Sequence, residues 1–141
     1  MGTNYYLVKQ IGEVCPHCGR GESSERLHIG KSSAGWCFGL HVRPEENIRS
    51  LEDWKKLFPS GKIVDEYGAE LSAATMIGEI TDRTWPKKRE DGPPWSYKSW
   101  QEFDRDNHSI AGPNGLSRHN YVGNLHSHGD GTWDCLTGDF S

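Results

Sequence analysis

Aliphatic side chains are scarce in this chain of 141 residues. Hydrophobic residues make up only 33% of it, and 17 glycines bring the apolar share to the low end of the usual globular range. This composition excludes a largely disordered chain, and the length fits one domain. Because aliphatic residues are so few, part of the core must come from six tryptophans and five tyrosines, or be replaced by a bound metal ion.

Long apolar runs and an excess of positive charge are also missing. No run approaches the roughly 18 residues of a membrane helix, and residues 1–10 lack the layout of a signal peptide. Four cysteines are too few for a disulfide framework, so we expect a protein of the cytoplasm. The formal net charge is -4, with 16 basic and 20 acidic residues, which argues against strong binding to nucleic acid.

The residue pattern predicts an α+β fold in a single domain spanning 1–141. Strands are expected at 4–9, 27–30, 36–42 and 62–65, and two short helices at 51–58 and 72–80. The chain divides into a zinc knuckle and hairpin at 13–43, a helical part at 50–80, an aromatic loop at 81–106 and a tail rich in Gly and His at 107–141. We predict a small antiparallel sheet, two short helices and long ordered loops.

The strongest local signal is the string Cys15-Pro16-His17-Cys18-Gly19. Two thiolates at this spacing bind one tetrahedral Zn²⁺ when a tight turn directs backbone amides at the sulfur atoms. Two more ligands must come from the expected hairpin, and imidazole reaches farther from a strand than a thiol does. Cys37 is therefore the alternative to His41, and a thioredoxin-like redox role fits less well because no helix follows the motif. The predicted zinc ligands are Cys15, Cys18, His28 and His41.

The tail holds five side chains that could form a second, hydrolytic metal site: His119, His126, His128, Asp130 and Asp134. The spacing of His126 and His128 puts both rings on one side of an extended segment. Gly129 and Gly131 instead indicate a solvated loop, so we assign no catalytic residue. Cys135 could act as a nucleophile beside a tail histidine, but a buried, inert thiol is the better interpretation.

Two other motifs, one typical of phosphate binding and one of nucleic-acid binding, are poorly supported by the residues beside them. Gly30-Lys31-Ser32 ends like a phosphate-binding loop, but Glu25 stands where that motif requires glycine. Lys31, Ser32 and Ser33 are therefore interpreted as part of a hairpin turn. The basic run Lys87-Lys88-Arg89, near Trp95 and Trp100, suits single-stranded nucleic acid, but Glu90-Asp91 follows it at once.

Several strings together make the chain resemble small uncharacterised zinc-knuckle proteins encoded by tailed bacteriophages and prophages. They lie at 15–19, at 28–36 with Phe38 and His41, at 112–116, and at 131–134 with Gly138, Phe140 and Ser141. The resemblance spans most of the chain and implies a phage product in the cytoplasm of the bacterial host. It also implies that position 37 varies more freely than positions 28 and 41, which favours His41 as a ligand.

These observations favour a zinc-stabilised protein that binds a host macromolecule, most simply a host protein, as a modulator or an inhibitor of host defence. The acidic net charge suits a protein partner better than nucleic acid. An enzymatic activity is the less favoured interpretation. The alternatives are a metal-dependent hydrolase that uses the His and Asp residues of the tail, and a nucleic-acid-binding zinc knuckle.

We predict that the purified protein carries one zinc ion and that Cys15→Ser or Cys18→Ser sharply lowers its thermal stability. The reason is that zinc binding coupled to folding contributes on the order of 10 kcal/mol. Elemental analysis and thermal unfolding check both statements. Cys37→Ala should retain more zinc than His41→Ala, and the opposite order would mean that the fourth ligand is wrongly assigned.

Overall fold

The computed structural model describes residues 2–11, 23–82, 89, 92–94, 96–120, 125–138 and 140. Nine strands and three α-helices lie within these ranges. In chain order they are β1 (Gly2–Ile11), β2 (Ser23–Ser33), β3 (Phe38–His41), α1 (Leu51–Leu57), β4 (Lys62–Asp65), β5 (Glu70–Leu71), α2 (Ala73–Thr81), α3 (Trp100–Asn107), β6 (Ser109–Ala111), β7 (Ser117–His119), β8 (Leu125–His128) and β9 (Trp133–Leu136). Short 3-10 helices cover Pro44–Glu46, Phe58–Ser60 and Pro113–Gly115.

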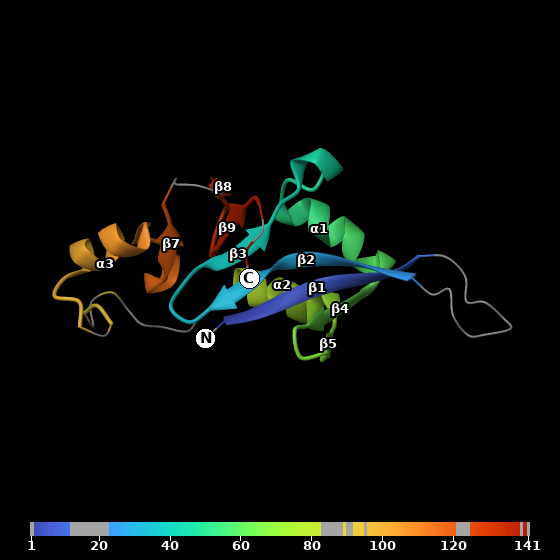
Figure 1. Ribbon diagram of the computed structural model, residues 1–141, viewed down its shortest axis with the longest axis horizontal. Helices are drawn as coiled ribbons and strands as arrows, with labels where there is room; N and C mark the ends of the chain where they lie inside the picture. Colours follow the sequence, from blue (N-terminus) through green and yellow to red (C-terminus); the bar gives the residue numbers. More distant parts are fainter. Residues whose placement is uncertain are drawn as a thin grey trace, which may run out of the picture.

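Seven of the strands form one mixed sheet in the order β5-β4-β1-β2-β3-β9-β8. All neighbouring pairs are antiparallel except β3 and β9, which run parallel. Strands β6 and β7 form a separate two-stranded ribbon. In Figure 1, α2 passes behind β1 and β2, while α3 and β7 form one end of the molecule. The ribbon is thus a separate layer beside the main sheet.

Each α-helix begins at a serine whose hydroxyl accepts a backbone N–H of the first turn. Ser50, Ser72 and Ser99 accept from the third residue after each of them. This N-cap satisfies a backbone donor that has no partner inside the helix. The predicted α+β class and the helices at 51–58 and 72–80 are confirmed. No helix in the described part of the chain is long and apolar enough to cross a membrane.

Three finer expectations are wrong. The sheet is larger than predicted and is mixed rather than antiparallel. The stretch 81–106, expected as a loop, contains most of a third helix, α3, which packs through Phe103. The segment around His126 and His128, interpreted as a solvated loop, is the edge strand β8. In each case the secondary structure depends on contacts with distant segments, which the local composition does not predict.

The core lies on one face of the sheet, between its strands and the helices α1 and α2. Phe38 and Leu40 alternate with Gly39 and His41 along β3, and only the first two belong to the hydrophobic core cluster. A register irregularity in the β1–β2 pairing lets Gly30 pair with Leu40 on the core face, while His28 pairs with Tyr6. The second face of the sheet therefore carries polar side chains.

Trp54 of α1 connects the core to β3. Its side chain is fully buried, and its indole N–H donates a 2.7 Å hydrogen bond to the carbonyl oxygen of His41. Trp54→Phe removes this donor and leaves a cavity, so we expect the free energy of unfolding to fall by about 2–3 kcal/mol. Urea denaturation measures the loss. Tyr67→Phe, at a position 76% exposed, is the control and should change stability by less than about 0.5 kcal/mol.

Candidate acid–base site

Asp134 is a fully buried carboxylate at the centre of a group of imidazole and guanidinium side chains. The backbone N–H and the Nδ1–H of His119 donate to Oδ2 over 2.8 and 3.0 Å. Nδ1–H of His128 donates to Oδ1 over 2.8 Å, and Nε of Arg118 lies 2.9 Å from the same oxygen. Both carboxylate oxygens are thus occupied, as a buried charge requires.

These partners change how readily Asp134 takes up a proton. Burial by itself would raise the pKa of the carboxyl group, because the charged form loses its hydration. The hydrogen bonds from His119 and His128 and the charge of Arg118 favour the ionised form, and together they hold the pKa below its ordinary value of 3.8. Asp134 is therefore a carboxylate at neutral pH.

Backbone pairing brings the three partner side chains to Asp134 from two other strands, Arg118 and His119 from β7 and His128 from β8. The N–H of Cys37 donates to Ser117 O, and the N–H of Ser117 donates to Gly35 O, which joins the start of β7 to the segment before β3. Since β9 pairs with β3, this junction places β7 beside β9. His128 pairs directly with Asp134 in the β8–β9 ladder.

Arg118 and two glycines shape the turn between β8 and β9. The guanidinium of Arg118 donates to the carbonyl oxygens of Gly131 and Trp133, so it holds the backbone that leads into Asp134. At Gly129, a Cβ atom would lie 2.0 Å from the indole nitrogen of Trp133. The glycines that indicated a solvated loop in the sequence therefore serve close packing of this turn against an aromatic ring.

The two histidines on Asp134 differ in their access to solvent. The His128 side chain is 18% exposed and its Nε2 atom is buried. The His119 side chain is 37% exposed and lines an open pocket of about 230 Å³. Within the part of the chain that the structure describes, no hydrogen bond occupies Nε2 of His119. His119 is thus a carboxylate-oriented imidazole whose second nitrogen faces an accessible space.

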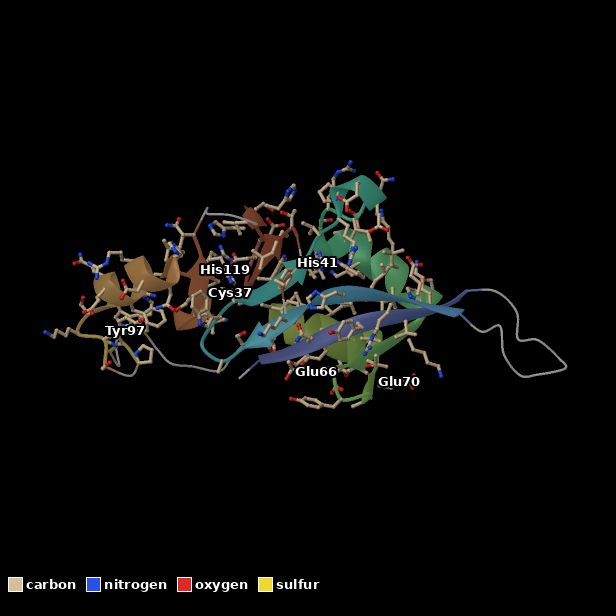
Figure 2. All side chains as sticks on the ribbon, viewed as in Figure 1. Cys37, His41, Glu66, Glu70, Tyr97 and His119 are labelled. Carbon is tan, nitrogen blue, oxygen red and sulfur yellow. The ribbon has the colours of Figure 1, made fainter. Side chains whose placement is uncertain are left out.

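The pocket lies between the β6–β7 ribbon and the second face of the sheet. Figure 2 shows Cys37 and His119 next to each other and His41 farther along β3, and Cys37 and His119 both belong to the pocket wall. The lining residues are Lys31, Ser33, Trp36, Cys37, Gly39, Asn107, His119, Leu136 and Phe140. Two aromatic rings, an ammonium group and an imidazole therefore meet around one space.

The structure selects three of the five tail residues singled out in the sequence. His119, His128 and Asp134 come together, whereas His126 and Asp130 are exposed and take no part in the hydrogen bonds described around Asp134. Sequence reasoning missed Arg118, because a single arginine between Ser and His carries no recognisable signal. Both Nδ1–H groups point at the carboxylate, so Asp134 orients both imidazole rings.

Cys135 is buried, as predicted. Burial raises the pKa of its thiol, and the nearby charges of Asp134 and Asp130 raise it further, although a hydrogen bond with Ser127 opposes them. A protonated thiol is a poor nucleophile at neutral pH. The interpretation of Cys135 as an inert thiol is thus supported.

Two of the four predicted zinc ligands lie side by side. His28 and His41 are buried on the second face of the sheet, with their Nδ1 atoms 3.0 Å apart, and Nε2 of His28 donates to Asn4 Oδ1 over 2.8 Å. Cys15 and Cys18 fall outside the described residues, so the full ligand set stays a prediction. Within the described ranges, no group of three or more His, Cys, Asp or Glu side chains is arranged to hold a metal ion.

Cys37 fits poorly as the substitute for His41. The two residues are four positions apart on the same face of an extended segment, which corresponds to roughly 13 Å. The Nδ1 of His28 is 3.0 Å from that of His41, so a zinc ion on His28 would be out of reach of Cys37. The geometry therefore favours His41 over Cys37.

No known protein family, curated protein sequence or solved structure matches this chain.

Replacement of Asp134 tests whether the carboxylate holds the site together. Asp134→Asn leaves Arg118 beside a neutral amide, so we expect the free energy of unfolding to fall by about 3–5 kcal/mol. The exposed neighbour provides the control, Asp130→Asn, which should cost less than about 0.5 kcal/mol. Because the pKa of Asp134 is lowered in the folded state, its stabilisation is complete above the ordinary value of 3.8 and is lost as the pH falls below it.

Urea denaturation of the wild type and of Asp134→Asn, from neutral pH down to below pH 3.8, measures this dependence. The difference between the two proteins should shrink at the acid end of the range. A difference that stays constant would show that the charge of Asp134 contributes nothing to stability.

Proposed function

We propose that the protein is a hydrolase in which His119 is the general acid and base. The observation that carries the proposal is the contact between Nδ1 of His119 and the buried carboxylate of Asp134, 3.0 Å long, at the wall of an open pocket. A carboxylate on one ring nitrogen fixes the tautomer and leaves the other nitrogen for proton transfer. The sequence offered, as an alternative, a metal-dependent hydrolase that uses the His and Asp residues of the tail. The hydrolase proposed here uses the same tail residues but needs no metal ion.

The chemistry follows from the position of each proton. Asp134 accepts a hydrogen bond from Nδ1–H of His119, so Nε2 carries a lone pair and can take a proton from a water molecule in the pocket. The water attacks the ester of a bound substrate, and Asp134 stabilises the imidazolium that forms. Nε2 then returns the proton to the departing oxygen. Asp134 stays ionised throughout, in keeping with its lowered pKa.

A zinc-stabilised protein that binds a host protein is the second candidate, and the His28–His41 pair supports its zinc site only. Two buried imidazoles with Nδ1 atoms 3.0 Å apart are close enough to contact one zinc ion at about 2.0–2.1 Å each. We infer that zinc on this pair, completed by Cys15 and Cys18, stabilises the second face of the sheet. A zinc-stabilised fold is compatible with an acid–base site elsewhere on the same face.

Binding to nucleic acid through the basic run receives less support. Lys87, Lys88 and Trp95 lie outside the described residues. Arg89 forms an ion pair with Asp104 and lies over the Trp100 ring, 4.2 Å from its centroid. Both the guanidinium and the ring are therefore occupied inside the protein, which lowers their value for phosphates and bases.

Chromogenic esters test the hydrolase directly. We expect turnover of at least one of 4-nitrophenyl phosphate, bis(4-nitrophenyl) phosphate and 4-nitrophenyl acetate, and a loss of about 10²–10⁴ in kcat for His119→Gln. The matched control is His126→Gln, because His126 is an exposed histidine on the adjacent edge strand. It should keep its rate within about twofold. Absence of turnover for all three esters, or an unchanged rate in His119→Gln, would contradict the proposal.

A further inference from the structure

We propose that the pocket beside His119 binds a mononucleotide, with the base between Trp36 and Phe140 and the phosphate at Lys31. This inference names the substrate class of the proposed hydrolase, and it rests on that function only for the step in which the phosphoester is cleaved. Three properties of the pocket carry it: two aromatic walls that pack against neighbouring rings, a cation with no carboxylate partner among the described residues, and a small volume.

The aromatic walls are held in place by neighbouring rings. The Trp36 ring packs against His119 and Phe103, with centroid distances of 5.1 and 6.1 Å. The Phe140 ring packs against His28 and His41, with centroid distances of 4.9 and 5.0 Å. Both rings also line the pocket. Fixed aromatic rings favour a planar ligand, since stacking of a base on such a ring contributes about 1–3 kcal/mol.

Lys31 supplies the positive charge of the pocket. Its stem lies beside Gly2, where a Cβ atom would be 2.3 Å from Lys31 Cε, so the absence of a side chain there makes room for it. Among the described residues, no carboxylate forms an ion pair with Lys31. An ammonium group in this position attracts an anion, and a phosphate is the anion that accompanies a planar base in biology.

The prediction that Lys31, Ser32 and Ser33 belong to the hairpin turn is wrong. Residues 31 to 33 belong to β2, and Lys31 pairs with Gly39 of β3. Gly39 keeps the floor of the pocket low, because a Cβ atom there would lie 2.9 Å from Leu136 Cδ1 and 3.3 Å from the Phe140 ring. Strand pairing thus carries the ammonium group to the same pocket as His119.

The volume restricts the size of the ligand. About 230 Å³ is less than the roughly 300–1,000 Å³ of pockets that enclose drug-sized molecules. One base with its sugar fits such a space when the phosphate lies at the mouth, whereas a duplex does not enter it. The acidic net charge of -4 also disfavours a long polyanion. A single nucleotide therefore fits the chemistry of the walls better than a nucleic-acid chain.

Isothermal titration calorimetry with AMP, GMP, CMP and UMP tests the proposal on the full-length protein. At least one of them should bind with a dissociation constant below about 1 mM. The matching nucleoside and ribose 5-phosphate should each bind at least about tenfold more weakly, because each lacks one of the two recognised groups.

Variants test the role of Lys31 in binding. Lys31→Met should weaken nucleotide binding about tenfold, whereas Lys62→Met, at an exposed lysine of β4, should leave it unchanged. The wild-type protein distinguishes the two proposals, because nucleotide binding without ester turnover would remove the hydrolase and keep the nucleotide pocket.

Three outcomes would overturn the nucleotide assignment. The first is that none of the four nucleotides binds at about 1 mM. The second is that the nucleoside binds as tightly as its nucleotide, or that Lys31→Met has no effect. The third is that phosphotyrosine or benzoate binds while the nucleotides do not, which would show that the pocket takes a different planar anion. Turnover of chromogenic esters with any of these results would leave the hydrolase in place.

Discussion

The burial of the Asp134 carboxylate is the constraint on which this end of the molecule depends. A buried charge costs several kcal/mol unless it is paired, and here the compensation comes from β7 and β8 rather than from β9 itself. Satisfying one carboxylate therefore fixes the ribbon against the edge of the sheet. The same hydrogen bonds orient the His119 ring, so the stability and the chemistry of the site have one origin.

The two faces of the sheet have different roles: one forms the hydrophobic core and the other carries the candidate site. One face packs Phe38 and Leu40 against α1 and α2, and Trp54 links this core to β3 through its indole N–H. The other face carries imidazole groups, Lys31 and a pocket. The core cluster is still mainly aliphatic, and its aromatic members are Tyr5, Phe38, Trp54 and Phe58.

Local signals predicted the parts of the fold that local interactions determine. Ser50 marked the start of α1 because an N-cap needs only its own first turn. Helix α3 was missed because Phe103 is its one buried residue, so no apolar stripe shows its period. The parallel pairing of β3 with β9 joins Phe38 to Trp133, and no local pattern encodes a contact over that separation.

The sequence predicted which residue types could form a site in the tail, but not which of those residues come together. The tail offered three histidines and two aspartates of equal standing, and only the docking of β7 beside β9 selects His119, His128 and Asp134 among them. Polar residues on either side of a glycine turn become cross-strand neighbours, a signal that the loop interpretation overlooked. The pocket combines Lys31 with His119, which are far apart in the sequence, so it emerges only in three dimensions.

The tautomer of His119 tests the central claim most directly. Long-range ¹H–¹⁵N correlation spectra distinguish the two ring nitrogens of a neutral imidazole. We expect Nδ1 to carry the proton toward Asp134 and Nε2 to be unprotonated, with this preference lost in Asp134→Asn. A neutral His119 ring protonated at Nε2, or a tautomer unchanged by Asp134→Asn, would contradict the claim that the buried carboxylate prepares His119 for proton transfer.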